Sequence, residues 1–177
     1  MKSLKRRLMA LWALVAQIRG YIALSRWVYR RIPLVGKVTS LFLDRLLLVV
    51  YAIDLRAIAI DVKALSISHP VGVLLGGNGI YSPGRVAVMS GVKFVAHSPD
   101  HPEYLRRHAE KRVFVLGDNV VLGANTVVIG PVTVCSGVLV GAMSLVNRDI
   151  TEPGVYVGTP VRKVADRVTD EWVRHLA

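Results

Sequence analysis

The stretch Leu116–Ile150 reads LGDNVV, LGANTV, VIGPVT, VCSGVL, VGAMSL, VNRDI when it is written in groups of six. The first position is always aliphatic: Leu116, Leu122, Val128, Val134, Val140 and Val146. The fifth is aliphatic or small and polar: Val120, Thr126, Val132, Val138, Ser144 and Ile150. A period of six is neither that of an α-helix nor the alternation of a strand. It predicts a chain that turns a corner every six residues, so that three faces close one coil of about 18 residues.

A weaker set of hexads lies before this stretch. From Leu55 the groups LRAIAI, DVKALS, ISHPVG, VLLGGN and GIYSPG run in frame, and Arg85 adds one residue before VAVMSG and VKFVAH. Between the two sets, residues 97–112 (HSPDHPEYLRRHAEKR) are polar and have no period of six. We interpret this segment as a loop that leaves the coil, and such excursions frequently carry function.

The composition fits one domain with a core. The chain has 177 residues, of which 53% are hydrophobic and 20% are charged, which excludes a disordered tail. The single cysteine, Cys135, excludes an intramolecular disulfide and a multi-cysteine zinc site, and it suits a reducing compartment. We expect this thiol to pack against its neighbours and not to act as a nucleophile.

The positive charge belongs to one segment. Residues 1–50 hold 10 Lys or Arg and one acid, Asp44, whereas residues 51–177 hold 13 basic and 11 acidic residues, so the net charges are +9 and +2. Residues 1–53 are predicted to be helical, with a break marked by Pro33 and Gly36. The uncharged runs are too short to cross a bilayer, and Leu8–Ile18 is not followed by a signal-peptide cleavage site.

Two interpretations of the basic segment remain open. In the first, its helices pack on each other and on a neighbouring subunit, and the arginines are solvated. In the second, a basic amphipathic surface rests on anionic lipid and holds a cytoplasmic protein at the inner face of a membrane. A nucleic-acid partner is not expected, because no helix-turn-helix, zinc finger or aromatic-studded sheet motif accompanies the charge.

The hexads and the closing segment DITEPGVYVGTPVRKV (149–164) resemble the hexapeptide-repeat acyltransferases. Val161 stands where that family usually has alanine. The resemblance implies a mainly β fold, a left-handed parallel β-helix over residues 54–164 with its loop at 97–112. The helical segment 1–53 precedes it and a short C-terminal helix, 165–177, closes it. It also implies a homotrimer that uses acetyl-CoA as co-substrate without a metal.

Acyl transfer to a hydroxyl needs a general base, and histidine suits that task because its pKa lies near neutrality. Asp54 and His69 lie 15 residues apart, and with ISHPVGVLLG they resemble the aspartate–histidine pair of serine acetyltransferases. By this resemblance His69 is the base and Asp54 orients it. Ser68 stands where those enzymes carry an acid that contacts the acceptor, which favours a sugar hydroxyl over serine.

The excursion offers other candidates. Arg107 and His108 resemble an Arg-His pair that serine acetyltransferases have before their later coils. A second resemblance, to galactoside and maltose acetyltransferases, makes His97 the base, since their catalytic histidine begins such a loop. His101 and Glu103 then contact the acceptor, together with Arg107 and Ser68. Both assignments hold at once if, in a trimer, His69 of one subunit meets His97 or His108 of the next.

By the same resemblance, coenzyme A lies along a groove of the coil. Small residues would let its pantetheine arm approach the backbone, and a turn followed by a basic pair would meet its phosphates. These residues are Gly123, Ala124, Gly141, Ala142, Thr159, Pro160, Arg162 and Lys163.

The sequence thus predicts a coenzyme A-dependent acetyltransferase acting on a sugar hydroxyl in surface-polysaccharide assembly, with a serine O-acetyltransferase as the alternative. Two weaker hypotheses are a zinc enzyme of the γ-carbonic anhydrase type, with His69, His97 and His101 as ligands, and a non-catalytic scaffold.

Overall fold

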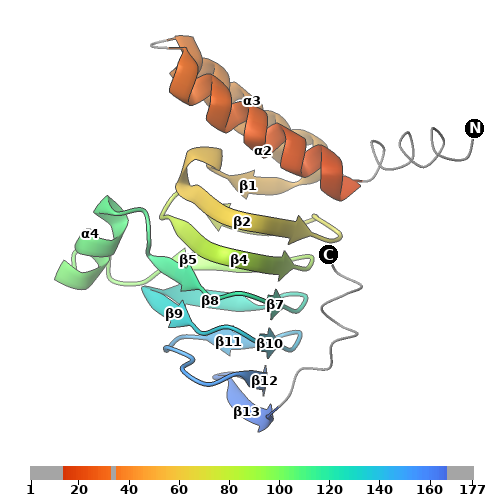
Figure 1. Ribbon diagram of the computed structural model, residues 1–177, viewed down its shortest axis with the longest axis vertical. Helices are drawn as coiled ribbons and strands as arrows, with labels where there is room; N and C mark the ends of the chain where they lie inside the picture. Colours follow the sequence, from red (N-terminus) through yellow and green to blue (C-terminus); the bar gives the residue numbers. More distant parts are fainter. Residues whose placement is uncertain (1–13, 33–34, 167–177) are drawn as a thin grey trace, which may run out of the picture.

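The computed structural model describes residues 14–32 and 35–166. Two helices come first, α2 (Leu14–Arg31) and α3 (Val35–Tyr51), and a 3-10 turn, η1, occupies Ala57–Ala59. The strands in chain order are β1 (Ile53–Leu55), β2 (Ile60–Ile67), β3 (Val73–Gly76), β4 (Ile80–Val88), β5 (Lys93–Ala96), β6 (Phe114–Leu116), β7 (Val120–Leu122), β8 (Val127–Gly130), β9 (Val132–Val134), β10 (Val138–Val140), β11 (Leu145–Val146), β12 (Gly154–Val157) and β13 (Arg162–Ala165). Figure 1 shows the strands stacked as rungs below the two helices.

The strands form a coil whose successive turns pair in parallel. Phe114 pairs with Val132, Val121 with Leu139, and Val127 with Leu145, so three faces repeat after 18 residues. The long strand β4 crosses two of these faces, because its start pairs with β6 and its end with β7. Only the closing pair of described strands, β12 with β13, is antiparallel. The predicted turn length of the coil is confirmed.

The hexad positions line the interior as predicted. All the first-position side chains of the Leu116–Ile150 stretch are at most 1% exposed. The fifth-position side chains are at most 4% exposed, and their small polar members Thr126 and Ser144 are buried with the rest. The earlier set follows the frame less closely, because Ile60 and Ile80 fill the interior in place of Asp61 and Gly79, and Val71 at a fifth position is 68% exposed. Cys135 packs against this core, as predicted.

The extra residue predicted at Arg85 is a real irregularity of β4. Val62 of β2 pairs with Ser82 of β4, and the next partners are Ala64 and Arg85, so β4 holds one more residue over this interval. The backbone N–H of Arg85 donates to Asp118 Oδ1 at 2.7 Å. The neighbouring rung therefore satisfies the displaced backbone.

The helices α2 and α3 form a hairpin that covers the first rungs of the stack. Ile18 and Leu47 contribute to the same core as Ile53 and Leu55. Gly36 was predicted to mark the break between helices, but it lies inside α3. A Cβ at this position would sit 2.4 Å from the Val28 carbonyl oxygen, so the absence of a side chain permits a close helix crossing. Neither of the two described hairpin helices is long and apolar enough to span a bilayer.

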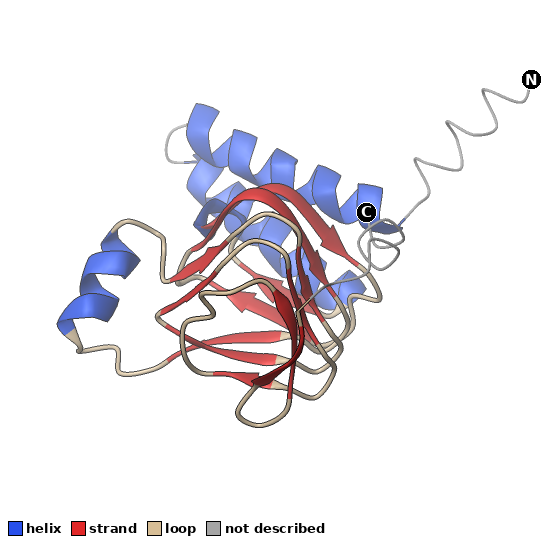
Figure 2. Ribbon diagram, turned by 60° about the horizontal axis from the view of Figure 1, so that its bottom comes forward, coloured by secondary structure: helices blue, strands red, loops and turns tan. Residues whose placement is uncertain are grey.

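The segment 97–112 is not a simple loop, because α4 (Pro102–Ala109) occupies its centre. His101 caps the N-terminus, Pro102 starts the first turn, and Glu103 pairs with Arg107 one turn later. Figure 2 shows this excursion standing away from the stack. The predicted C-terminal helix, 165–177, lies outside the described residues except at its start, where Ala165 ends β13.

Candidate active site

One edge of the stack gathers the predicted catalytic residue His69 and six of the eight predicted cofactor-binding residues. We call it the His69 edge, and it consists of the five corners that follow β2, β4, β7, β10 and β12. The first four lead to the β3–β5–β8–β11 face, and the fifth bonds to Leu145 of β11 and leads to β13. These corners are residues 68–72, 89–92, 123–126, 141–144 and 158–161.

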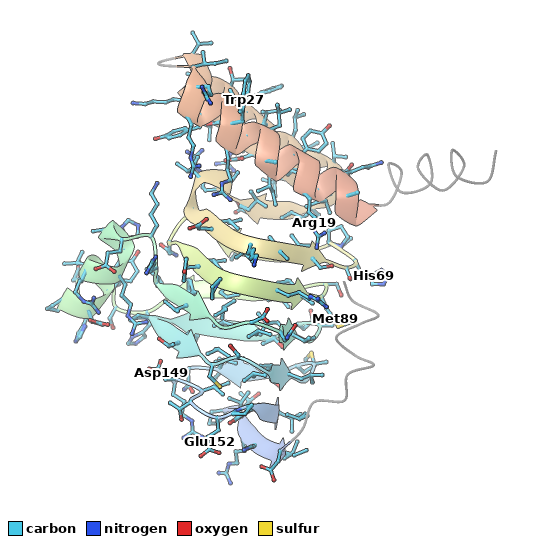
Figure 3. The ribbon with its side chains drawn as sticks, in the orientation of Figure 1. Arg19, Trp27, His69, Met89, Asp149 and Glu152 are labelled. Atoms are coloured by element: carbon cyan, nitrogen blue, oxygen red, sulfur yellow. The ribbon has the colours of Figure 1, made fainter. Side chains whose placement is uncertain are left out.

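Hydrogen bonds join these corners in register. Backbone N–H groups of Gly91, Asn125 and Met143 donate to the carbonyls of Val71 at 3.0 Å, Ser90 at 2.8 Å and Ala124 at 2.8 Å, respectively. The Thr159 hydroxyl donates to the Met143 carbonyl at 3.4 Å. Figure 3 shows His69 and Met89 on the same side of the stack.

His69 lies on a corner that is longer than the one below it. Ile67 pairs with Val88 and Leu74 pairs with Lys93, so this corner holds two residues more than the next. His69 turns the chain with a left-handed φ of 55°, and its side chain is exposed. The longer corner therefore holds an imidazole at the edge, where a substrate can reach it.

The structure does not join Asp54 to His69. Asp54 pairs in register with Leu74, five residues beyond the histidine, and its side chain is exposed on the strand β1. No hydrogen bond or ion pair links this carboxylate to the imidazole among the described residues. The spacing of 15 residues brings Asp54 and His69 to adjacent turns of the coil. The strand register, however, places Asp54 on the β1 face and His69 at a corner.

The excursion leaves the stack at a different edge, between β5 and β6. The His97 ring Nδ1 lies 2.7 Å from the Ser98 hydroxyl. His101 caps α4, because its Nδ1 accepts from the Glu103 backbone N–H at 3.3 Å. His108 is exposed and stacks on Tyr104, with ring centroids 5.4 Å apart. Two of these three histidines thus have local partners within α4.

Glu103 and Arg107 fasten α4 to the stack. The Glu103 carboxylate pairs with Arg107 at 2.6 Å, and Arg107 Nη1 donates to the Thr133 hydroxyl of β9 at 3.1 Å. Hydrogen bonds from Arg107 and Arg106 hold the pKa of Glu103 below its ordinary value. Tyr104 adds a second tie, because its hydroxyl donates to Asn78 Oδ1 at 2.9 Å. The sequence predicted acceptor contacts for Glu103 and Arg107, and the structure shows that they already bind each other.

The histidines of one chain are therefore divided between two edges. In the common orientation of Figures 1 and 3, His69 lies on the right of the stack and α4 on the left. The proposed zinc ligands His69, His97 and His101 are not brought together in this chain. In the part of the chain that the structure describes, no group of three His, Cys, Asp or Glu side chains could hold a metal ion.

All the predicted coenzyme A residues except Arg162 and Lys163 lie on the His69 edge, but its glycines have a structural explanation. A Cβ on Gly123 would lie 2.6 Å from the Ala142 nitrogen, and one on Gly141 would lie 2.6 Å from a Val157 methyl carbon. These glycines let successive corners stack, whatever binds outside. Ala142 is exposed and Ala124 half-buried, so the alanines are the small residues that face solvent.

The two basic residues after the last corner, Arg162 and Lys163, differ in their ion pairs. Lys163 pairs with Glu152 at 3.0 Å and with Asp166 at 2.9 Å, and these carboxylates raise the pKa of its ammonium group. Arg162 is exposed at the start of β13. Arg162 is thus better placed than Lys163 to meet a phosphate without breaking an ion pair.

Sequence reasoning missed two methionines on the same edge. Met89 is half-buried, and Met143 is 71% exposed at a left-handed corner residue with φ of 59°. The hexad frame placed both in corners, and this was the signal that could have found them. An exposed, flexible thioether beside small residues suits contact with an apolar ligand arm.

Comparisons with known proteins agree with this fold. No protein-family model matches the chain. Serine acetyltransferase 4 of Arabidopsis thaliana is 26% identical over 152 residues, which are 85% of this chain and 40% of that relative. The serine acetyltransferase structure from Brucella abortus strain S19 superposes with a TM-score of 0.72 at 17% identity, covering 87% of this chain and 58% of that chain. The structure of the same enzyme in complex with coenzyme A gives a TM-score of 0.67 at 16% identity, with 87% and 57% covered.

The chain spans about half the length of the curated relatives it matches. The match includes the helices as well as the rungs, since it covers far more of this chain than the hexads alone. The chain is therefore similar in sequence to the serine acetyltransferases and has the fold of these hexapeptide-repeat acyltransferases.

Proposed function

We propose that this protein is an acetyl-CoA-dependent O-acetyltransferase built on a left-handed parallel β-helix. One observation carries the proposal: an exposed histidine stands at the head of an edge of small corner residues, on the fold of the serine acetyltransferases. That a relative binds coenzyme A supports the choice of co-substrate.

In this proposal His69 is the general base. Its imidazole takes the proton of the acceptor hydroxyl as the hydroxyl oxygen attacks the thioester carbonyl. The carbon–sulfur bond then breaks, and the imidazolium returns the proton to the departing thiolate, so the histidine is regenerated. Backbone N–H groups at the corners are the candidates for stabilising the oxyanion. The half-buried Ala124 and the exposed Ala142 leave room beside the backbone for the pantetheine arm.

A second copy of the chain would complete the site. His69 and the excursion lie at different edges of one chain, so a histidine of the excursion reaches His69 only from a neighbour. We therefore propose a homotrimer in which His97 or His108 of one subunit faces His69 of the next. In such an arrangement the tie from Glu103 through Arg107 to Thr133 would fix the position of α4, and with it His108, relative to the neighbouring subunit.

Serine is the first candidate acceptor, because the similar proteins are serine acetyltransferases. A sugar hydroxyl is the second candidate, and Ser68 is the specific observation that favours it. This hydroxyl stands beside His69 at the place where the family carries an acid, and a neutral group attracts the ammonium of an amino acid less than a carboxylate does. A role in polysaccharide assembly belongs to this second candidate.

The first experiment measures thiol release from acetyl-CoA with serine or with a panel of sugars. We expect His69→Gln to lower kcat by about 100-fold or more, because a general base contributes about that much. The variants His97→Gln and His108→Gln test the two alternative histidines in the same assay, with thermal unfolding to show that each variant folds.

Full activity of His69→Gln combined with loss of activity in His97→Gln would move the base to the excursion. Absence of thiol release with every acceptor, together with no thermal stabilisation by acetyl-CoA, would favour the scaffold hypothesis. The variant Ser68→Asp tests the acceptor: an increased preference for serine would support the role of this position.

A further inference from the structure

The outer surface of the helical hairpin carries large exposed apolar side chains. We define the outer hairpin face by Leu24 and Trp27 of α2 and by Val35, Val38, Phe42 and Val49 of α3. Phe42 is 62% exposed, Val38 70% and Val49 80%. Figure 3 shows Trp27 on the hairpin, at the end of the molecule away from β13. A contiguous apolar surface on an end face marks an interaction site more often than isolated exposed residues do.

The spacing in α3 makes this face a single stripe. Residues 35, 38, 42, 45 and 49 follow one another at intervals of three or four, so they lie on one side of the helix. The opposite side holds Gly36, Ser40, Asp44 and Leu47, all of which are buried. The helix therefore packs through a side that contains polar groups, and its apolar stripe is left exposed.

The charges around the outer hairpin face have one sign. In residues 14–53 the sequence contains one acid, Asp44, and its carboxylate is 2% exposed and paired with Arg56 at 3.6 Å. The exposed basic residues of the described hairpin are Arg19, Arg30 and Arg31 on α2, and Lys37 and Arg45 on α3. An apolar surface edged by cations alone is complementary to the headgroup region of an anionic bilayer.

A second copy of this face is a poorer partner. Symmetric packing of two hairpins would bring together two surfaces that are edged by Lys37 and Arg45, without an exposed acid on either hairpin to compensate. A lipid surface instead supplies both an apolar interior and negative charge.

We propose that the outer hairpin face lies on an anionic membrane surface, with α2 and α3 in the plane of the interface. The hairpin caps one end of the stack, so the rungs and the His69 edge extend away from the lipid (Figure 1). This inference depends on the exposed face and its charges, and it holds whatever acceptor the enzyme uses.

The test is co-sedimentation of the full chain with phosphatidylcholine vesicles that contain or lack phosphatidylglycerol. We expect binding to the anionic vesicles that weakens as salt is added. The double variant Phe42→Ser/Val49→Ser should bind about tenfold or more weakly, because it removes two apolar anchors. The double variant Lys37→Gln/Arg45→Gln should lose most of the preference for anionic lipid.

Two matched controls distinguish vesicle binding by this surface from non-specific apolar adsorption and from an effect of net charge. Leu105→Ser removes an apolar residue that is 55% exposed on α4, and Lys93→Gln/Lys111→Gln removes two exposed lysines outside the hairpin. Both control variants should bind as the parent does. Thermal unfolding of every variant shows that it folds.

Equal binding of the parent to neutral and anionic vesicles would overturn the proposal. So would binding that survives in both hairpin variants, since another basic segment would then be responsible. A parent oligomer that falls apart in Phe42→Ser/Val49→Ser without any vesicle binding would assign the face to contacts between copies. Retained thiol release in a non-binding variant separates failure of this proposal from failure of the acetyltransferase proposal.

Discussion

The stack and the hairpin differ in the kinds of side chain that they bury. The interior of the stack is a column of aliphatic residues from successive rungs, and its largest side chains, Phe94 and Phe114, meet edge to face with ring centroids 4.9 Å apart. The hairpin is joined around buried polar groups, where the Ser25 hydroxyl donates to Asp44 Oδ1 at 2.8 Å and the Ala57 N–H donates to Asp44 Oδ2 at 3.3 Å. It buries Ile18 and Leu47 against the first rungs, but other large apolar residues, Trp27 and Phe42 among them, face outward. The comparison shows that the apolar residues of the stack are arranged around one interior, whereas the hairpin has apolar residues both on the buried side and on the exposed side.

The largest difference should appear on truncating one phenylalanine in each region. Phe114→Ala leaves a cavity in a fully buried layer, and we expect it to lower the free energy of unfolding by about 3–5 kcal/mol. Phe42→Ala on the hairpin should change it by less than about 0.5 kcal/mol. Denaturant unfolding at equal protein concentration measures both values. Similar losses for the two variants would mean that Phe42 is buried in an assembly.

A pair of glycines should give effects of opposite sign. Gly123→Ala places a Cβ against the backbone of the next corner, so we expect a loss of about 1–3 kcal/mol. Gly20→Ala lies within α2, where a new Cβ meets nothing within 4 Å, and should gain about 0.5–1 kcal/mol from helix propensity. Thermal melts of the two variants check the signs. A neutral Gly123→Ala would show that the corners can spread apart, and its glycine would then regain a role toward a ligand.

The smallest effect concerns the buried carboxyl of the hairpin. Burial raises the pKa of Asp44, although Ser25, Ala57 and Arg56 oppose the increase. The folded chain therefore holds this proton at a higher pH than the unfolded chain does, so this contribution to stability is present at low pH and is lost as the pH rises through the raised pKa.

Asp44→Asn removes this dependence. At low pH we expect the variant to be about 1 kcal/mol less stable than the parent, because its amide nitrogen cannot accept from the Ala57 N–H. The difference should shrink as the pH rises from about 4 to 8, and denaturant titrations across this range measure it. A difference that grows with pH would show that the charged carboxylate stabilises the hairpin.

Much of the stack was predictable because the residue types within each hexad indicate locally which side chain points inward and where the chain turns. The aliphatic positions identified the interior, and the extra residue at Arg85 was visible as a break in the frame. The excursion was recognised, but its helix was not, since α4 has eight residues and two turns are too few for a periodic signal. Its only local signs were Pro102 at the first turn and the Glu103–Arg107 spacing.

The sequence by itself determined the repeat, the helical character of the N-terminal segment and the basic charge of that segment. These are local properties, and a pattern of six residues, or a run of apolar and basic residues, expresses them directly. Tertiary structure decided that Asp44 is buried, that Asp54 and His69 lie on different parts of their rungs, and that His69 and the excursion occupy different edges. Such relations depend on strand register and on helix crossing, which join residues far apart in the chain, and two residues more in a single corner are enough to change them.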